Sequence, residues 1–169
     1  MNIRKLCLND AKDFNEIRLR ALLNSPESFG SSYEEEKNKK MQDILVEFNK
    51  HSNENFILGI FENQVLIGIA GFYREKQIKS NHKGVIWGVY IEPEYRGKRY
   101  GRQLIIQLIK EICLCNGLEQ INIRVNSNNF SAKKLYSCLD FMEYGREKNA
   151  LKINGSYFDE DLMVKFISK

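Results

Sequence analysis

Glycine and cationic residues are concentrated in Tyr95–Arg102, which reads Y-R-G-K-R-Y-G-R. Val85–Glu94 before it predicts a strand, and Gln103–Ile112 after it predicts a helix. A helix N-terminus leaves backbone N–H groups unpaired and carries partial positive charge, which suits a phosphate group. Gly97 and Gly101 would let the backbone approach such a ligand closely. Four cationic side chains add full charges around the turn: Arg96, Lys98, Arg99 and Arg102. The segment favours a pyrophosphate site, with a solvated turn as the alternative.

Other phosphate-binding classes fit the sequence less well. Neither G-x-x-x-x-G-K-[ST] nor G-x-G-x-x-G occurs in the chain. The net charge of +4 and the pI of about 8.8 are only mildly basic. There is no basic arm and no recognised nucleic-acid motif, so a nucleic-acid-binding domain is a weaker alternative and we expect no nucleic-acid partner.

Hydrophobic periodicity predicts an alternation of hairpins and helix crossovers. The expected strands cover residues 3–8, 55–61, 65–72, 85–92, 120–125, 142–153 and 157–166, and the expected helices cover residues 10–23, 34–48, 100–116 and 131–139. Hairpins combined with crossovers require a mixed sheet, so the fold class is α/β. No linker or repeat divides the chain, and we expect a single domain over residues 1–169.

Two segments resemble the GCN5-related N-acetyltransferase (GNAT) family. Residues 89–104 resemble its Q/R-x-x-G-x-G/A loop, with Arg96 and Gly101 in place. Arg99 replaces the middle glycine, which is acceptable in a helical backbone conformation but not at positive φ. Residues 129–141, N-F-S-A-K-K-L-Y-S-C-L-D-F, resemble N-x-x-A-x-x-L-Y-x-x-x-G-F, in which Asp140, a residue that tolerates left-handed turns, replaces glycine.

The predicted order of elements also resembles this fold over nearly the whole chain. The resemblance implies a mixed, mostly antiparallel sheet with flanking helices and a splayed central strand pair, opened near Gly88. It implies that the backbone of Val89 and Ile91 binds the pantetheine arm of acetyl-CoA. The remaining cofactor-binding candidates are Arg96, Gly97, Lys98, Arg99, Tyr100, Gly101 and Arg102 at the diphosphate, with Asn129 and Lys134 on the next crossover.

The resemblance implies that acetyl is transferred from acetyl-CoA to a primary amine of a small molecule or peptide. Tyr136 would protonate the departing thiolate, a role that a phenol can fill; a core tyrosine is the alternative. The position matching the family's glutamate base is near Val85, which is apolar, so a non-catalytic acyl-CoA sensor of the same fold is a second hypothesis. The base candidates left open are Glu92, Tyr33, Glu34 and Glu35.

Acidic residues suggest the charge of the acceptor. The family builds its acceptor pocket from the early helices and the last hairpin, which here contain Glu34–Glu36 and Asp159–Asp161. Acidic side chains there would favour a cationic amine such as a polyamine, an aminoglycoside or a protein lysine.

Metal binding and membrane insertion are not expected. The four cysteines and two histidines do not form a ligand cluster, and buried free thiols are the better interpretation. No apolar run would span a bilayer, and the N-terminus has no signal-peptide pattern. We expect a cytoplasmic protein with no metal and no membrane partner. Dimers are common in such folds, so a homodimer is one expected assembly.

Overall fold

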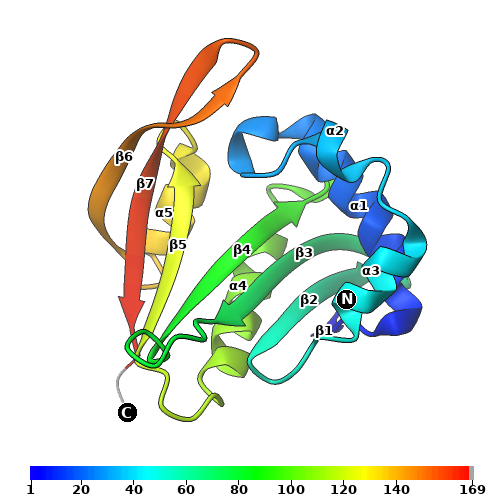
Figure 1. Cartoon of the computed structure of the whole chain (residues 1–169), viewed down its shortest axis with the longest axis horizontal. Helices are drawn as coiled ribbons and strands as arrows, with labels where there is room; N and C mark the ends of the chain where they lie inside the picture. The colour runs from blue at the N-terminus through cyan, green and yellow to red at the C-terminus, as the bar shows by residue number, and fades with distance from the viewer. Residues whose placement is uncertain (168–169) are drawn as a thin grey trace.

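The computed structural model describes residues 1–167, which contain one seven-stranded sheet in the order β1-β2-β3-β4-β5-β7-β6 (Figure 1). The strands are β1 (Asn2–Lys5), β2 (Asn55–Glu62), β3 (Val65–Arg74), β4 (Lys83–Ile91), β5 (Gln120–Asn126), β6 (Met142–Ile153) and β7 (Ser156–Phe166). The pair β4–β5 is parallel and the other neighbouring pairs are antiparallel. The predicted α/β fold with a mixed, mostly antiparallel sheet is confirmed.

Helices cover both faces of the sheet (Figure 1). They are α1 (Ala11–Asn24), α2 (Tyr33–Glu36), α3 (Met41–Phe48), α4 (Tyr100–Ile112) and α5 (Phe130–Ser137), with single turns η1 (Leu8–Asp10), η2 (Pro26–Ser28) and η3 (Pro93–Tyr95). Alternate residues of β2 point to opposite faces: Phe56 packs in the core with α4, and Ile57 packs in the core with α1. Burial on both faces explains why β2 and β3 are apolar almost throughout.

The sheet opens between β4 and β5. Their pairing runs from Lys83↔Gln120 to Ile86↔Ile123 and stops there, although both strands continue. On the other edge of β4, two residues lie between Trp87 and Tyr90 where β3 has one, so β4 contains a bulge. Gly88 sits in this bulge with φ of +63°, a conformation that favours glycine. The bulge turns β4 away from β5, as the predicted splay requires.

Two helices differ from the sequence prediction, and Asp140 agrees with it. The single helix expected over 34–48 is wrong: α2 and α3 are separate, because the K-N-K-K segment between them has no apolar side chain to bury. The helix expected to reach residue 116 ends at Ile112, and Gly117 follows with φ of +73°. Asp140 does adopt the left-handed conformation, with φ of +64°. No helix within residues 1–167 is long and apolar enough to cross a bilayer.

Candidate active site

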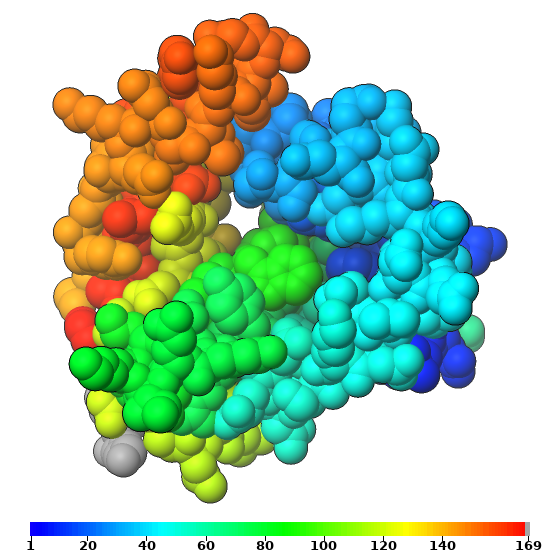
Figure 2. Space-filling view, in the orientation of Figure 1, coloured from blue at the N-terminus to red at the C-terminus, as the bar shows by residue number. Residues whose placement is uncertain are grey.

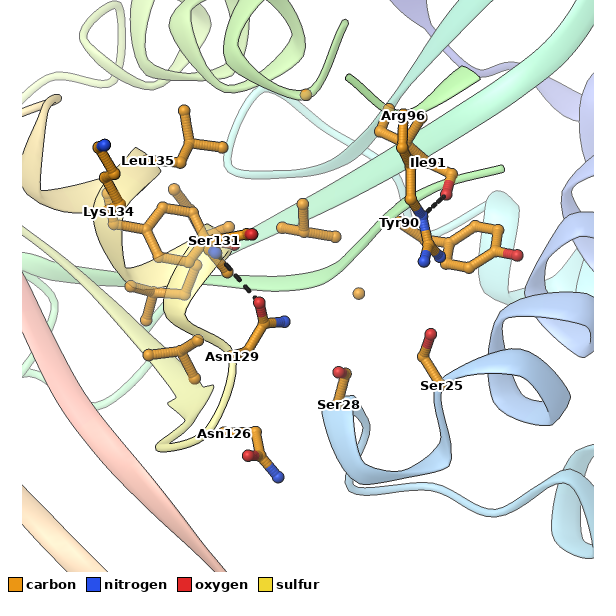
Figure 3. A pocket seen from close by; sticks show the side chains of 18 of the residues that line it. Ser25, Ser28, Tyr90, Ile91, Arg96, Asn126, Asn129, Ser131, Lys134 and Leu135 are labelled. Atoms are coloured by element: carbon orange, nitrogen blue, oxygen red, sulfur yellow. Dashed lines mark hydrogen bonds between the residues drawn. The ribbon is translucent and has the colours of Figure 1, made fainter. Parts of the chain in front are cut away.

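A cleft of about 1140 Å³ lies where β4 and β5 part. Its walls come from β4, from the turn between η3 and α4, from β5 and α5, and from the η2 segment. Figure 2 shows the surface hollowed between the segments that form β4, β5 and the chain after α1. Sequentially distant segments therefore meet around one opening (Figure 3).

Most of the residues proposed from the sequence line this cleft. They are Val89, Ile91, Arg96, Gly97, Arg99, Tyr100, Gly101, Arg102, Asn129, Lys134 and Tyr136. Lys98 is not among the lining residues, and its Nζ lies 5.1 Å from the centre of the Tyr95 ring. The Tyr100 hydroxyl already donates to Glu62, so this side chain is anchored to the end of β2.

The turn before α4 presents a row of free donors. The first helical hydrogen bond runs from the Gln103 N–H to the Arg99 carbonyl, at 3.1 Å. Within the described residues, the backbone N–H groups of residues 97–102 have no protein partner. A Cβ at Gly101 would make only ordinary van der Waals contacts, 3.7 Å from Ile91 and 3.8 Å from Leu135. The row of free donors suits a diphosphate at the start of α4.

Arg99 has a strained backbone conformation in this turn. Its φ of 65° and ψ of 10° are left-handed, which differs from the helical conformation that would have tolerated arginine. An L-residue other than glycine, asparagine or aspartate reaches this region at a cost of about 1–2 kcal/mol. The arginine therefore adds a cation to the turn at the expense of backbone strain.

Replacing Arg99 with glycine should raise the free energy of unfolding by up to about 1 kcal/mol, because the relieved strain exceeds the extra chain entropy of glycine. Urea denaturation would measure the change. Lys98→Gly is the matched control: Lys98 is not at positive φ, so its replacement should lower the free energy of unfolding by about 0.5–1 kcal/mol. A loss of stability in Arg99→Gly equal to that in Lys98→Gly would show that no strain is stored at residue 99.

Arg96 is turned away from the row of free donors. Its backbone N–H donates to the Pro93 carbonyl at 3.1 Å, and its Nε donates to the Ile91 carbonyl at 2.9 Å. The guanidinium lies over the Tyr90 ring, 5.4 Å from its centre. The backbone donor of Arg96 is therefore used within η3, and its Nε holds the side chain against β4 (Figure 3).

The exposed edge of β4 is positioned to bind an extended ligand. The Glu92 N–H donates to the Ile67 carbonyl of β3, at 2.9 Å. Because backbone groups alternate between the two edges of a strand, those of Ile91 and Val89 are directed toward the cleft. The Ile91 carbonyl already accepts a hydrogen bond from Arg96. The groups that this edge can use to bind a ligand are therefore the N–H of Ile91 and the N–H and carbonyl of Val89.

Tyr136 reaches the cleft from α5. Its side chain is only 4% exposed and packs against Phe141, with ring centres 5.8 Å apart. Burial raises the pKa of its phenol well above the ordinary value, so the hydroxyl keeps its proton at neutral pH. Among the described residues no hydrogen bond uses this hydroxyl. Asn129 fixes the start of the same helix, because its Oδ1 accepts from the Ala132 N–H at 3.0 Å.

The acidic residues considered for the acceptor pocket do not line the cleft. They are engaged with other groups: Glu34 with Lys37, Glu35 with Ser32, Glu36 with Arg18, Asp159 with the Asn149 N–H, Glu160 with Arg124, and Asp161 with Lys133 and Arg146. The base candidate Glu92 is 6% exposed and is bound to Arg20 and to the Tyr90 hydroxyl.

The cleft also has lining residues that the sequence did not single out. Ser25, Glu27 and Ser28 line it from the η2 segment, and Asn126 lines it from β5. Asn126 is 3% exposed and donates from Nδ2 to the Glu27 carbonyl at 3.1 Å, which ties η2 to the end of β5. In the sequence, N-S-P-E-S indicates only a break after α1, so nothing there could place these residues at the site.

A family model described as the Acetyltransferase (GNAT) family matches residues 19–141. The chain belongs to this family. As a GNAT protein it is an acetyl-CoA-dependent N-acetyltransferase, which confirms the family and the enzyme class indicated by the two motifs. A curated relative, the spermidine N(1)-acetyltransferase of Vibrio cholerae, is 25% identical over 159 residues, covering 94% of this chain and 92% of the relative.

Solved structures share the fold of this GNAT protein. A GNAT-family acetyltransferase from Streptococcus pneumoniae has a TM-score of 0.89 at 22% identity, covering 98% of this chain and 99% of that one. The structure of yncA from Salmonella typhimurium, solved with its cofactor acetyl-CoA, has a TM-score of 0.87 at 22% identity, covering 100% of this chain and 95% of that one. At these identities the likeness supports the fold alone.

Proposed function

We propose that this GNAT protein acetylates a primary amine of a small molecule or peptide by direct attack on acetyl-CoA, with Tyr136 as the general acid. One observation carries the proposal: a buried phenol without a hydrogen-bond partner among the described residues lines the same cleft as the row of free N–H groups before α4. Bound acetyl-CoA would supply a thioester for attack by the amine and a thiol as leaving group.

The residues present fit such a cofactor at three points. The N–H groups of residues 97–102 would hold the diphosphate, with charge added by Arg99, Arg102 and Lys134. The free edge of β4 at Val89 and Ile91 would bind the pantetheine arm as an added strand does. Asn129 keeps an unused Nδ2 on the opposite wall, because only its Oδ1 caps α5.

The role of Tyr136 follows from its surroundings. A thiolate that forms in a cleft screened from water gains more from a nearby proton donor than it would in solution. The raised pKa of the Tyr136 phenol keeps that proton available over the whole physiological range. The phenol would hold its proton at Oη until the sulfur departs.

The charge of the acceptor is supported differently by the relative and by the cleft. The relative from Vibrio cholerae acts, by its name, on spermidine, which agrees with the cationic acceptor proposed from the sequence. The acidic side chains on which that proposal depended are engaged elsewhere, however, and do not line the cleft. The acceptor proposal therefore covers primary amines in general.

Calorimetry with acetyl-CoA, followed by assays of thiol release with spermidine, free amino acids and a lysine peptide, tests the proposed function. We expect acetyl-CoA binding and turnover with at least one amine. Acetyl-CoA binding without turnover of any amine would favour the acyl-CoA sensor. Binding of a DNA duplex but not of acetyl-CoA would contradict both readings.

A further inference from the structure

The side chain of Arg96 is fixed on one side of the part of the cleft between Tyr90 and η2, which is called the acceptor end below. Its Nε bond to the Ile91 carbonyl and its stacking over Tyr90 hold the guanidinium against β4. Neither terminal nitrogen, Nη1 or Nη2, has a hydrogen bond or an ion pair within the described residues, although Arg96 lines the cleft. An arginine held at one nitrogen, with two others free, is arranged to bind a planar anion.

Hydroxyl groups face the same opening from the other wall. Ser25 and Ser28 lie at the ends of η2, and Figure 3 shows their side chains directed toward the opening that Arg96 and Tyr90 border. Their hydroxyls make no hydrogen bond within residues 1–167. The bond from Asn126 to the Glu27 carbonyl fixes this wall relative to β5. Two neutral donors thus oppose a cation across the acceptor end.

A second arginine, buried beneath this end in an ion pair with Glu36, keeps one nitrogen unpaired. The Arg18 side chain is 8% exposed, and its Nε and Nη2 donate to Glu36 at 3.2 and 2.9 Å. Its Nη1 is buried without a hydrogen-bond partner. A Cβ added to Gly88 would have a single neighbour within 4 Å, this Nη1 at 3.8 Å. Burying an unpaired donor is unfavourable, and the donor here is directed at a residue that lines the cleft.

We propose that the acceptor is an amine that also carries a carboxylate, bound through the free nitrogens of Arg96 and the hydroxyls of Ser25 and Ser28. This rests on the proposed acetyl transfer and narrows its substrate class. Glu27 lines the same end without an ion-pair partner in the described residues, so the wall offers one charge of each sign. That pattern complements a free amino acid, whereas a polyamine would place a second cation close to Arg96.

Kinetics with paired acceptors would test this assignment. Each free L-amino acid of a panel is compared with its carboxamide, using wild type, Arg96→Gln and the matched control Arg102→Gln. We expect wild type to favour the carboxylate partner at least about tenfold in kcat/KM, the size of one charge-assisted pair. Arg96→Gln should remove that preference and leave the KM for acetyl-CoA unchanged. Arg102→Gln should raise the KM for acetyl-CoA and keep the preference.

The opposite results would overturn the assignment. A rise in the KM for acetyl-CoA in Arg96→Gln, with the carboxylate preference intact, would place Arg96 at the diphosphate instead. Turnover restricted to spermidine or to carboxamides would also overturn it, while leaving the proposed acetyl transfer standing. Failure of wild type to bind acetyl-CoA would contradict the proposed transfer itself, so the two failures are distinguishable.

Discussion

Replacing Tyr136 with phenylalanine is expected to lower kcat by about 100- to 10,000-fold, the range of a general acid. The substitution removes only the hydroxyl, and the ring keeps its contact with Phe141. No hydrogen bond among the described residues depends on that hydroxyl, so the fold should be retained. Stopped assays of thiol release would measure kcat, and calorimetry should show unchanged acetyl-CoA binding.

The control for this prediction is Tyr144→Phe, because Tyr144 is 60% exposed and does not line the cleft. Its kcat should equal that of wild type.

The pH profile of kcat gives a second test of the role of Tyr136. Since burial raises the phenol pKa of Tyr136 above 10.0, ionisation of Tyr136 should cause no loss of rate below about pH 10. A Tyr136→Phe enzyme as active as wild type would assign the tyrosine to the core instead.

The sequence predicts the parts of the site that are built locally. The turn before α4 and the N-cap of α5 depend on neighbouring residues, so Gly97, Gly101 and Asn129 could be placed in advance. The period-2 and period-3.6 patterns set the strands and helices that bring those segments together. The same patterns predicted the mixed sheet, because its hairpins and crossovers are encoded in the order of elements.

The residues that could not be predicted are those placed by long-range contacts. The sequence makes Glu36 an acceptor candidate, but Arg18, on another helix, pairs with it and both side chains are buried. Asn126 contacts Glu27, 99 residues away in sequence, and so brings η2 to the cleft. The left-handed conformation of Arg99 was also beyond the sequence, because the motif has glycine at this position and glycine populates positive and negative φ alike.

Replacing Asp161 with alanine is expected to lower the free energy of unfolding by about 1.5–3 kcal/mol, the range for hydrogen bonds to a charged group, because the cations left behind are partly exposed to water. Asp161 is 0% exposed and binds Lys133 of α5, Arg146 of β6 at 2.6 Å and the Ser127 hydroxyl at 2.9 Å. Its loss leaves Arg146 without this carboxylate and Lys133 with Glu143 alone, and it weakens the hold on α5, which carries Tyr136. Urea denaturation would measure the stability, and kcat should fall as well.

Asp159→Ala is the matched control. Among the described residues the Asp159 carboxylate accepts one hydrogen bond, from the Asn149 N–H, so its loss should cost about 1 kcal/mol.

Burial alone would raise the pKa of Asp161, but the hydrogen bonds from Lys133, Arg146 and Ser127 outweigh it and hold the pKa below 3.8. A depressed carboxyl pKa stabilises the folded state at every pH above the unfolded value and loses that effect only as the pH falls through the folded value. The difference in stability between wild type and Asp161→Ala should therefore stay constant from pH 7 to about pH 5 and shrink below it. A difference that already shrinks between pH 7 and about pH 5 would mean that the carboxyl is not held ionised by these partners.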